Sequence, residues 1–249
     1  NFFLADRMNE GNALSKAAHK RHFDVVNTIL RRDGIDDTDY AFCIPKYQYK
    51  EEYFYMLVAF MNQGAVLERN NNTGEITMKP VLGWTSEKYF TIPIEAALII
   101  AAWSGNIETV NYLLSQGAEV HNDIYCSDPL VMAVSEGFVD VVLSLLDHGA
   151  DVNQQSCKTE TALCKAAEGG HSNVVQILLE QKDLDINVQC YYRYTALMKA
   201  VKKGHIDIVL SLLDHGADVH KKAISDDPTA VLQAAHAGDT FMVKTLVEH

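Results

Sequence analysis

The stretch Thr161-Ala-Leu-Cys-Lys-Ala-Ala-Glu-Gly-Gly170-His-Ser-Asn-Val-Val-Gln-Ile-Leu-Leu179 decides the fold. Each half places apolar residues on one helical face: Leu163, Ala166 and Ala167 in the first half and Val174, Val175, Leu178 and Leu179 in the second. Spacings of three and four residues are typical of an amphipathic helix. Gly170 interrupts the helical path between the halves. The stretch therefore predicts two short helices joined by a tight turn.

The same pattern recurs along the chain. A glycine returns every 32 to 34 residues, at Gly105, Gly137, Gly170, Gly204 and Gly238. An alanine stands four residues before each of them, at Ala101, Ala133, Ala166, Ala200 and Ala234. A repeat of this period predicts stacked helix-turn-helix units, and the polar, turn-rich residues between units predict hairpin-like fingers.

These motifs resemble the ankyrin repeat family, whose pattern begins T-P-L-H-x-A-A-x-x-G-H. It is matched by Thr161-Ala-Leu-Cys-Lys-Ala-Ala-Glu-Gly-Gly-His, Thr195-Ala-Leu-Met-Lys-Ala-Val-Lys-Lys-Gly-His and Asp128-Pro-Leu-Val-Met-Ala-Val-Ser-Glu-Gly-Phe. The resemblance implies an all-α fold, an ankyrin-repeat solenoid. One departure is consistent, because the family's histidine is replaced by Ile99, Val131, Cys164, Met198 and Leu232. The hydrogen bonds of that histidine are then lost or replaced.

We expect one domain over residues 1–249 with seven repeats, approximately 9–38, 39–67, 91–122, 123–155, 156–189, 190–223 and 224–249. The second repeat is degenerate, since Pro45 and Glu52 stand where the pattern has leucine and glycine. Residues 68–90 exceed the repeat length. Within them, Asn70–Gly74 predicts a turn and Glu75–Lys79 a strand, which together favour an extended finger. The apolar last repeat predicts a cap or further chain after His249.

Composition narrows the partners. The formal net charge is −12, from 21 Lys+Arg against 33 Asp+Glu, and such a field repels nucleic acid and anionic lipid. The longest apolar stretches, such as Ile92–Trp103, are too short to span a bilayer, so we expect no membrane insertion. Five cysteines without a C-x-x-C motif fit a reducing compartment better than a disulfide framework. The predicted location is cytoplasmic, or the host cytosol for a secreted bacterial effector.

The sequence contains few features that indicate catalysis, cofactor binding or metal binding. It has no G-x-S-x-G, H-E-x-x-H, phosphate-loop or dinucleotide motif, so no catalytic residue and no cofactor is predicted. Cys126, Cys157 and Cys190 fall near the starts of successive fingers, a repeat step apart, whereas zinc needs its sulfur ligands around one centre. No metal site is predicted.

The sequence gives more evidence for protein binding than for catalysis. In proteins that this sequence resembles, partners contact the finger tips and the last turn of each first helix, which line a concave face. Carried over by position, the candidate partner-binding residues are Trp103, Tyr125, Glu136, Lys158, Glu168, Tyr191, Tyr192, Tyr194, Lys202, Lys203 and His236. Trp84, in the insertion, is a secondary candidate that either forms an exposed tip or folds back over the second repeat.

The three tyrosines of one finger stand out, because tyrosine supplies large contact area at small entropic cost. Together with Lys202 and Lys203 they predict a site for an acidic or mixed-charge segment. Alternation along an extended finger predicts that Tyr191 and Tyr192 lie on opposite faces, and packing against a neighbouring finger is the alternative role. Trp103 has the same two alternatives.

Asn153 and Asn187 occupy a position that is hydroxylated in some similar repeats of animal proteins, and hydrogen bonding to the finger turn is the favoured alternative. As a whole, the sequence predicts a non-catalytic protein-protein interaction module that binds another protein or peptide. The alternatives are a recruiting arm of a larger protein (an effector enzyme, a ubiquitin-ligase subunit or a channel's cytoplasmic domain) and a spacer.

Overall fold

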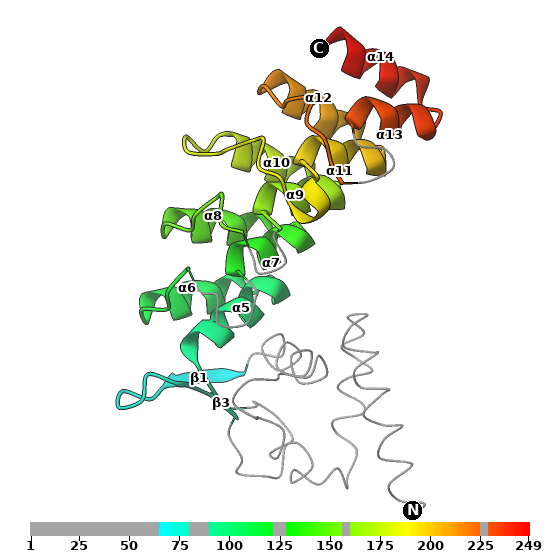
Figure 1. Ribbon diagram of the computed structural model, residues 1–249. Helices are drawn as coiled ribbons and strands as arrows, with labels where there is room; N and C mark the ends of the chain where they lie inside the picture. Colours follow the sequence, from blue (N-terminus) through cyan, green and yellow to red (C-terminus); the bar gives the residue numbers. More distant parts are fainter. Residues whose placement is uncertain (1–64, 80–89, 122–127, 156–159, 225–228) are drawn as a thin grey trace, which may run out of the picture. The chain divides into compact units, whose positions relative to one another are not determined.

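The computed structural model describes residues 65–79, 90–121, 128–155, 160–224 and 229–249 (Figure 1). The first predicted repeat, almost all of the second and the middle of the insertion lie outside these residues. The chain divides into two compact units, Asn1–Thr109 and Val110–His249, which we describe separately. No helix in the described part of the chain is long and apolar enough to cross a membrane.

The described part of the first unit contains a three-stranded antiparallel sheet in the order β1 (Val66–Arg69), β2 (Ile76–Lys79) and β3 (Phe90–Ile92). Asn70 opens the turn between β1 and β2, and its carbonyl accepts a hydrogen bond from the Gly74 amide at 2.8 Å. The turn and strand predicted at residues 70–79 are therefore confirmed. The hairpin begins at Val66 rather than at residue 68, because Val66 pairs with Lys79.

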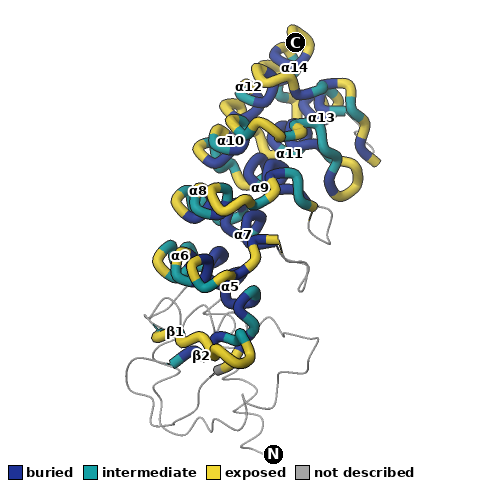
Figure 2. Tube along the Cα trace, turned by 90° about the vertical axis from the view of Figure 1, so that its left-hand side faces the viewer, coloured by how far each residue is buried: buried dark blue, intermediate teal, exposed yellow. Residues whose placement is uncertain are grey.

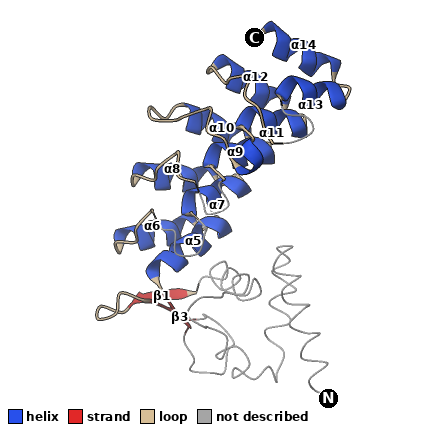
Figure 3. Ribbon diagram, viewed as in Figure 1, coloured by secondary structure: helices blue, strands red, loops and turns tan. Residues whose placement is uncertain are grey.

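Ten α-helices follow the sheet in the described residues (Figure 3). Helix α5 (Ile94–Ser104) belongs to the first unit, and α6 (Ile107–Ser115) crosses the boundary between the units. The second unit continues with α7 (Pro129–Glu136), α8 (Val139–Asp147), α9 (Ala162–Gly169), α10 (Ser172–Leu179), α11 (Ala196–Lys203), α12 (Ile206–Asp214), α13 (Ala230–His236) and α14 (Thr240–Glu248). Successive helices form the predicted antiparallel pairs, which confirms the helix-turn-helix fold class.

Within the second unit the helices form two layers. Helices α7, α9, α11 and α13 pack in sequence in one layer, and α8, α10 and α12 pack in the other. Figure 2 shows buried positions gathered along α7, α9 and α11, and exposed positions on the outer turns of α8, α10 and α12. The predicted core faces are confirmed, because Leu163, Ala166 and Val175 are all almost fully buried.

Four of the five residues that replace the family's histidine are buried, and Leu232 is exposed. Val131, Cys164 and Met198 are buried at the starts of α7, α9 and α11. Each backbone amide is satisfied by the cap residue three positions earlier, as in the 3.2 Å hydrogen bond from the Cys164 amide to the Thr161 hydroxyl. Stability at these helix starts therefore comes from caps and apolar burial rather than from a histidine network.

The glycine between paired helices is required by the backbone. Gly137 has φ of 77°, and its amide bonds to the Val134 carbonyl while the Phe138 amide bonds to Ala133. The side chain of His171, from the next repeat, lies against Gly137, and its Nε2 atom is 3.1 Å from the Ser135 carbonyl oxygen. A Cβ at Gly137 would clash with that ring, so this glycine serves both the turn and the stacking of repeats.

Candidate protein-binding surface

Residues 190–194, between α10 and α11, form a compact loop that we call the Tyr finger. A single 3-10 turn, Tyr191–Arg193, forms its tip, and the Cys190 amide donates to the Tyr194 carbonyl at 2.7 Å. Tyr192 has φ of 55° and Arg193 has φ of 61°, and they are the two non-glycine residues with positive φ among the described residues. Consecutive left-handed residues with side chains are strained, and such strain persists only where surrounding contacts hold it.

The tip brings two aromatic rings together. The Tyr191 and Tyr192 ring centroids are 4.1 Å apart with an interplanar angle of 61°, and the residues are 52% and 55% exposed. The prediction that they lie on opposite faces is wrong, because the left-handed turn at Tyr192 breaks the alternation of an extended strand. A hydrogen bond with Tyr192 raises the pKa of the Tyr191 hydroxyl. The finger therefore presents one continuous aromatic surface.

The finger is attached to both neighbouring repeats. Cys190 forms a disulfide with Cys164 of α9, with the two Cα atoms 6.9 Å apart. On the other side, the Ile224 amide donates to the Tyr192 carbonyl at 2.8 Å. Gln189 links the finger to its neighbour through its side-chain amide, which donates to the carbonyl oxygens of Arg193 and Lys222. These contacts account for the strained turn.

The disulfide departs from the expectation of a chain without such bonds. Cys164 occupies the position of the family's histidine in one repeat, and Cys190 begins the finger of the next repeat. Stacking therefore brings the two residues together, although 26 positions separate them in the sequence. The predicted cytoplasmic location is untested and stays a prediction.

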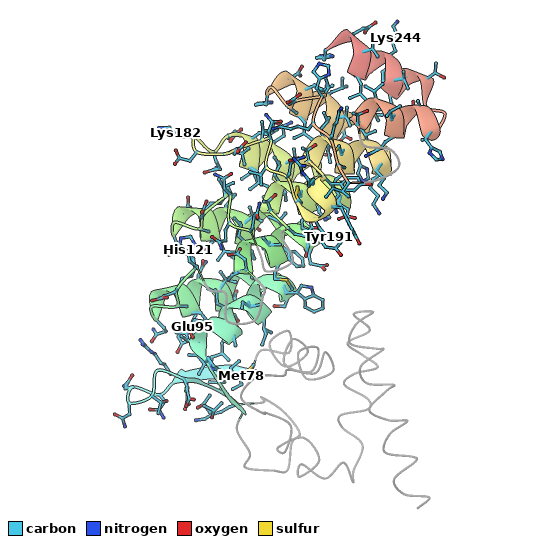
Figure 4. All side chains as sticks on the ribbon, in the orientation of Figure 1. Met78, Glu95, His121, Lys182, Tyr191 and Lys244 are labelled. Carbon is cyan, nitrogen blue, oxygen red and sulfur yellow. A yellow bond between two sulfur atoms is a disulfide. The ribbon has the colours of Figure 1, made fainter. Side chains whose placement is uncertain are left out.

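Lysines line the last turn of α11 beside the finger. Lys202 is exposed, and its Nζ atom lies 5.2 Å from the centroid of the Tyr194 ring, within the range of a cation–π contact. Lys203 is also exposed, and its Nζ atom lies 3.9 Å from a Glu168 carboxylate oxygen. The structure thus pairs Tyr191 with Tyr192 at the tip of the finger and Tyr194, at its end, with Lys202 of the following helix. Tyr191 is labelled in Figure 4.

A carboxylate-lysine network lies behind this surface. Lys199 is largely buried and its Nζ atom lies 2.9 Å from Glu168 and 3.4 Å from Glu160. Burial by itself would raise the pKa of Glu168, but the hydrogen bond from Lys199 and the charges of Lys199, Lys165 and Lys203 outweigh it. The pKa of Glu168 is therefore lowered, and its carboxylate is ionised and compensated by the protein.

The remaining candidate residues have different surroundings. Glu136 is half-buried at the end of α7, and His236 is exposed at the end of α13. Trp103, on α5 of the first unit, is only 9% exposed, which favours the packing alternative over partner contact. Tyr125, Lys158 and Trp84 lie outside the described residues.

Sequence reasoning missed the groups that support the finger. Gln189, Arg193 and Ile224 match no family position that signals a role, and Lys199 falls on a helix position that the pattern leaves variable. The one available signal was the pair of cysteines, since both stand at positions that stacking places in adjacent repeats.

Asn153 and Asn187 hold successive loops together. The Asn153 side chain donates to the Asp183 carbonyl at 2.6 Å and accepts from the Asp185 amide at 2.8 Å. Asn187 accepts from the Asp218 amide at 2.8 Å and donates to the Gly216 carbonyl at 3.4 Å. Their side-chain amides bond to the next repeat, whereas their backbone amides donate to Asp151 and Asp185 in their own turns. The favoured hydrogen-bonding role is therefore correct in kind, but the side-chain partners lie in the next repeat.

The described residues contain no group of three or more His, Cys, Asp or Glu side chains that could hold a metal ion. An open hollow of about 290 Å³ lies between the loops near Leu114, His121 and His148, away from the Tyr finger. Its lining also includes Ala118, Glu119 and Val120.

Comparison with protein families agrees with this architecture. A family model for ankyrin repeats in three copies matches residues 130–223, and a model for a single ankyrin repeat matches residues 95–124. The chain therefore belongs to the ankyrin repeat family, with about four copies across residues 95–223. Ankyrin repeats are generally protein-interaction modules. No curated protein matches the sequence. The count of seven repeats stays a prediction.

Proposed function

We propose that this chain is a non-catalytic module that binds another protein through its fingers and the concave face, with the Tyr finger and the last turn of α11 as the principal contact. The observation that carries the proposal is the pair of exposed tyrosine rings held on a strained turn. Exposed aromatic residues on a rigid support lose little entropy when they bind, and tyrosine is enriched among the residues that dominate binding energy.

Rigidity is the reason to propose this surface among the described residues. The disulfide and the hydrogen bonds from Ile224 and Gln189 fix the finger before any partner arrives. Pre-organisation of this kind raises affinity because less conformational freedom is lost on association. The same surface would serve a free-standing adaptor and the recruiting arm of a larger protein.

A quantitative capture experiment tests the proposal. Three baits are immobilised: the 249-residue chain, a Tyr191→Ala/Tyr192→Ala/Tyr194→Ala variant and a Phe241→Ala variant. The proteins that each bait captures from a cell lysate are compared by mass spectrometry. Phe241 is a matched control because it is an exposed aromatic residue, on α14. We expect a partner retained by the native chain and by Phe241→Ala, and reduced at least about tenfold by the triple variant.

The triple variant must keep its circular dichroism spectrum and cooperative unfolding for the comparison to count. A variant lacking residues 70–88 examines the insertion in the same experiment. A partner lost only with that deletion would place the site on the long finger instead. Equal capture by all variants would contradict the proposal.

A further inference from the structure

The charges around the Tyr finger indicate which kind of segment it binds. We propose that the partner presents an acidic and apolar segment, with an Asp or Glu carboxylate against Lys202 and a large apolar side chain over Tyr191 and Tyr192. This inference rests on the proposed function and adds the chemistry of the ligand.

The balance of charge on this surface favours an acidic segment over a basic one. Both carboxylates of the adjacent network are already compensated: Glu168 by Lys199, Lys165 and Lys203, and Glu160 by Lys199. The Oε2 atom of Glu160 has no hydrogen-bond partner, but it is buried and out of reach of a ligand. No uncompensated anion in the described part of this surface therefore attracts a basic segment.

Lys202 provides an exposed positive charge next to the finger. Its side chain is exposed, and its contact among the described residues is with the Tyr194 ring rather than with a carboxylate. In a chain of net charge −12, an exposed cation beside an aromatic surface that pairs with no carboxylate among the described residues departs from the general trend. An incoming carboxylate gains a charge-assisted hydrogen bond there without displacing an existing ion pair.

The cations of this surface favour a carboxylate over a phosphate as the anionic group of the ligand. Bidentate phosphate recognition uses the planar fork of arginine. The one arginine of the finger, Arg193, donates from Nε and Nη2 to the Gln189 side-chain oxygen, at 3.3 and 3.2 Å. The site thus offers the single positive charge of Lys202, which matches the one negative charge of a carboxylate better than the nearly double negative charge of a phosphate, and we commit to a carboxylate.

The exposed apolar residues of the finger require an apolar side chain in the bound segment. Ile224 is exposed, and its amide bonds to the Tyr192 carbonyl, so its backbone adjoins the tip of the finger. The adjoining backbone segments thus carry three exposed apolar residues, Tyr191, Tyr192 and Ile224. A segment made only of acidic residues would leave this area uncovered, whereas one leucine or phenylalanine would bury part of it.

The test is selection of ligands from a random peptide library displayed on phage, with the 249-residue chain as bait. We expect enriched peptides that combine Asp or Glu with a large apolar residue. Synthetic copies should bind the Lys202→Glu variant at least about tenfold more weakly. Lys244→Glu is the matched control, because Lys244 is an exposed lysine whose Nζ atom lies 3.7 Å from Glu248 on α14. It should leave the affinity unchanged.

Other results would overturn the inference in distinguishable ways. Peptides without an acidic preference that still lose binding to Tyr191→Ala/Tyr192→Ala would overturn the acidic ligand and leave the proposed function standing. Peptides indifferent to both the lysine and the tyrosine variants, or no enriched peptide, would overturn both. A phosphoserine peptide that binds more than tenfold better than its glutamate counterpart would overturn the choice of carboxylate.

Discussion

The Tyr finger and helix α14 both expose apolar side chains, but the surroundings of these side chains differ. Phe241 on α14 is 58% exposed, about as much as Tyr191 and Tyr192. It lies on a regular helix, where Lys244 is already close to Glu248. The finger instead combines a strained turn, a disulfide, hydrogen bonds to the next repeat and a lysine that pairs with no carboxylate among the described residues. Exposure is therefore common to both regions, whereas the pre-organised and charged support belongs to the finger and is the reason why we propose the site there.

The largest expected effect comes from removing the disulfide. A Cys164→Ala/Cys190→Ala variant should lose about 3 kcal/mol of unfolding free energy, because a cross-link across 26 residues restricts the unfolded chain. Urea unfolding of the native chain and the variant measures the difference. Hydrogen exchange should become faster at the finger amides and stay unchanged on α14.

Dithiothreitol supplies the control for that prediction. It should destabilise the native chain by a similar amount and leave the double alanine variant unaffected. A native chain that is insensitive to the reductant would mean that the cross-link does not support the finger.

A glycine substitution should have opposite signs in the two regions. Tyr192→Gly should stabilise the fold by about 1 kcal/mol, because glycine adopts a φ of 55° without the strain of a side chain. Lys244→Gly, at an exposed position within α14, should destabilise it by roughly 0.5–1 kcal/mol through lower helix propensity. Thermal or urea unfolding of both variants measures the contrast. A destabilised Tyr192→Gly variant would contradict the claim that the turn is strained.

The smallest expected effect concerns acid. The pKa of Glu168 is lowered in the folded chain from its ordinary value of 4.5, so its interactions add stability above pH 4.5. That contribution is lost as the pH falls below 4.5 towards the folded pKa. We expect less than about 1 kcal/mol, since Glu168 is partly exposed and solvent screens its partners.

Glu168→Gln should be less stable than the native chain at pH 7 and should approach it near pH 3. The two unfolding curves, measured across this range, give the result directly. A constant difference between pH 7 and pH 3 would show that ionisation of Glu168 does not contribute.

The helices were predictable from sequence because their residues repeat. Leu163, Ala166 and Gly170 recur in register, so periodicity and turn chemistry were enough to place the helix pairs. The strand at residues 76–79 followed from alternation after a turn. These features depend on neighbours within a few positions of one another.

The geometry of the site was not predictable in the same way. The left-handed turn at Tyr192 depends on bonds from Ile224, which belongs to another repeat. The sequence alternation of Tyr191 and Tyr192 therefore indicated the wrong relative orientation. The disulfide was not predicted, because its two cysteines belong to different repeats and meet only when the repeats stack. Contacts between repeats, rather than the repeat pattern, determine the site.

The most direct test of the central claim is a double charge reversal, read by fluorescence polarisation. An acidic peptide selected on the native chain is compared with a copy in which its Asp or Glu is replaced by Lys, on the native chain and on Lys202→Glu. We predict that each single reversal weakens binding at least about tenfold and that the two reversals together restore affinity to within a few-fold. If the doubly reversed pair binds as weakly as the two separate losses combined, Lys202 does not contact the carboxylate and the account of this surface is wrong.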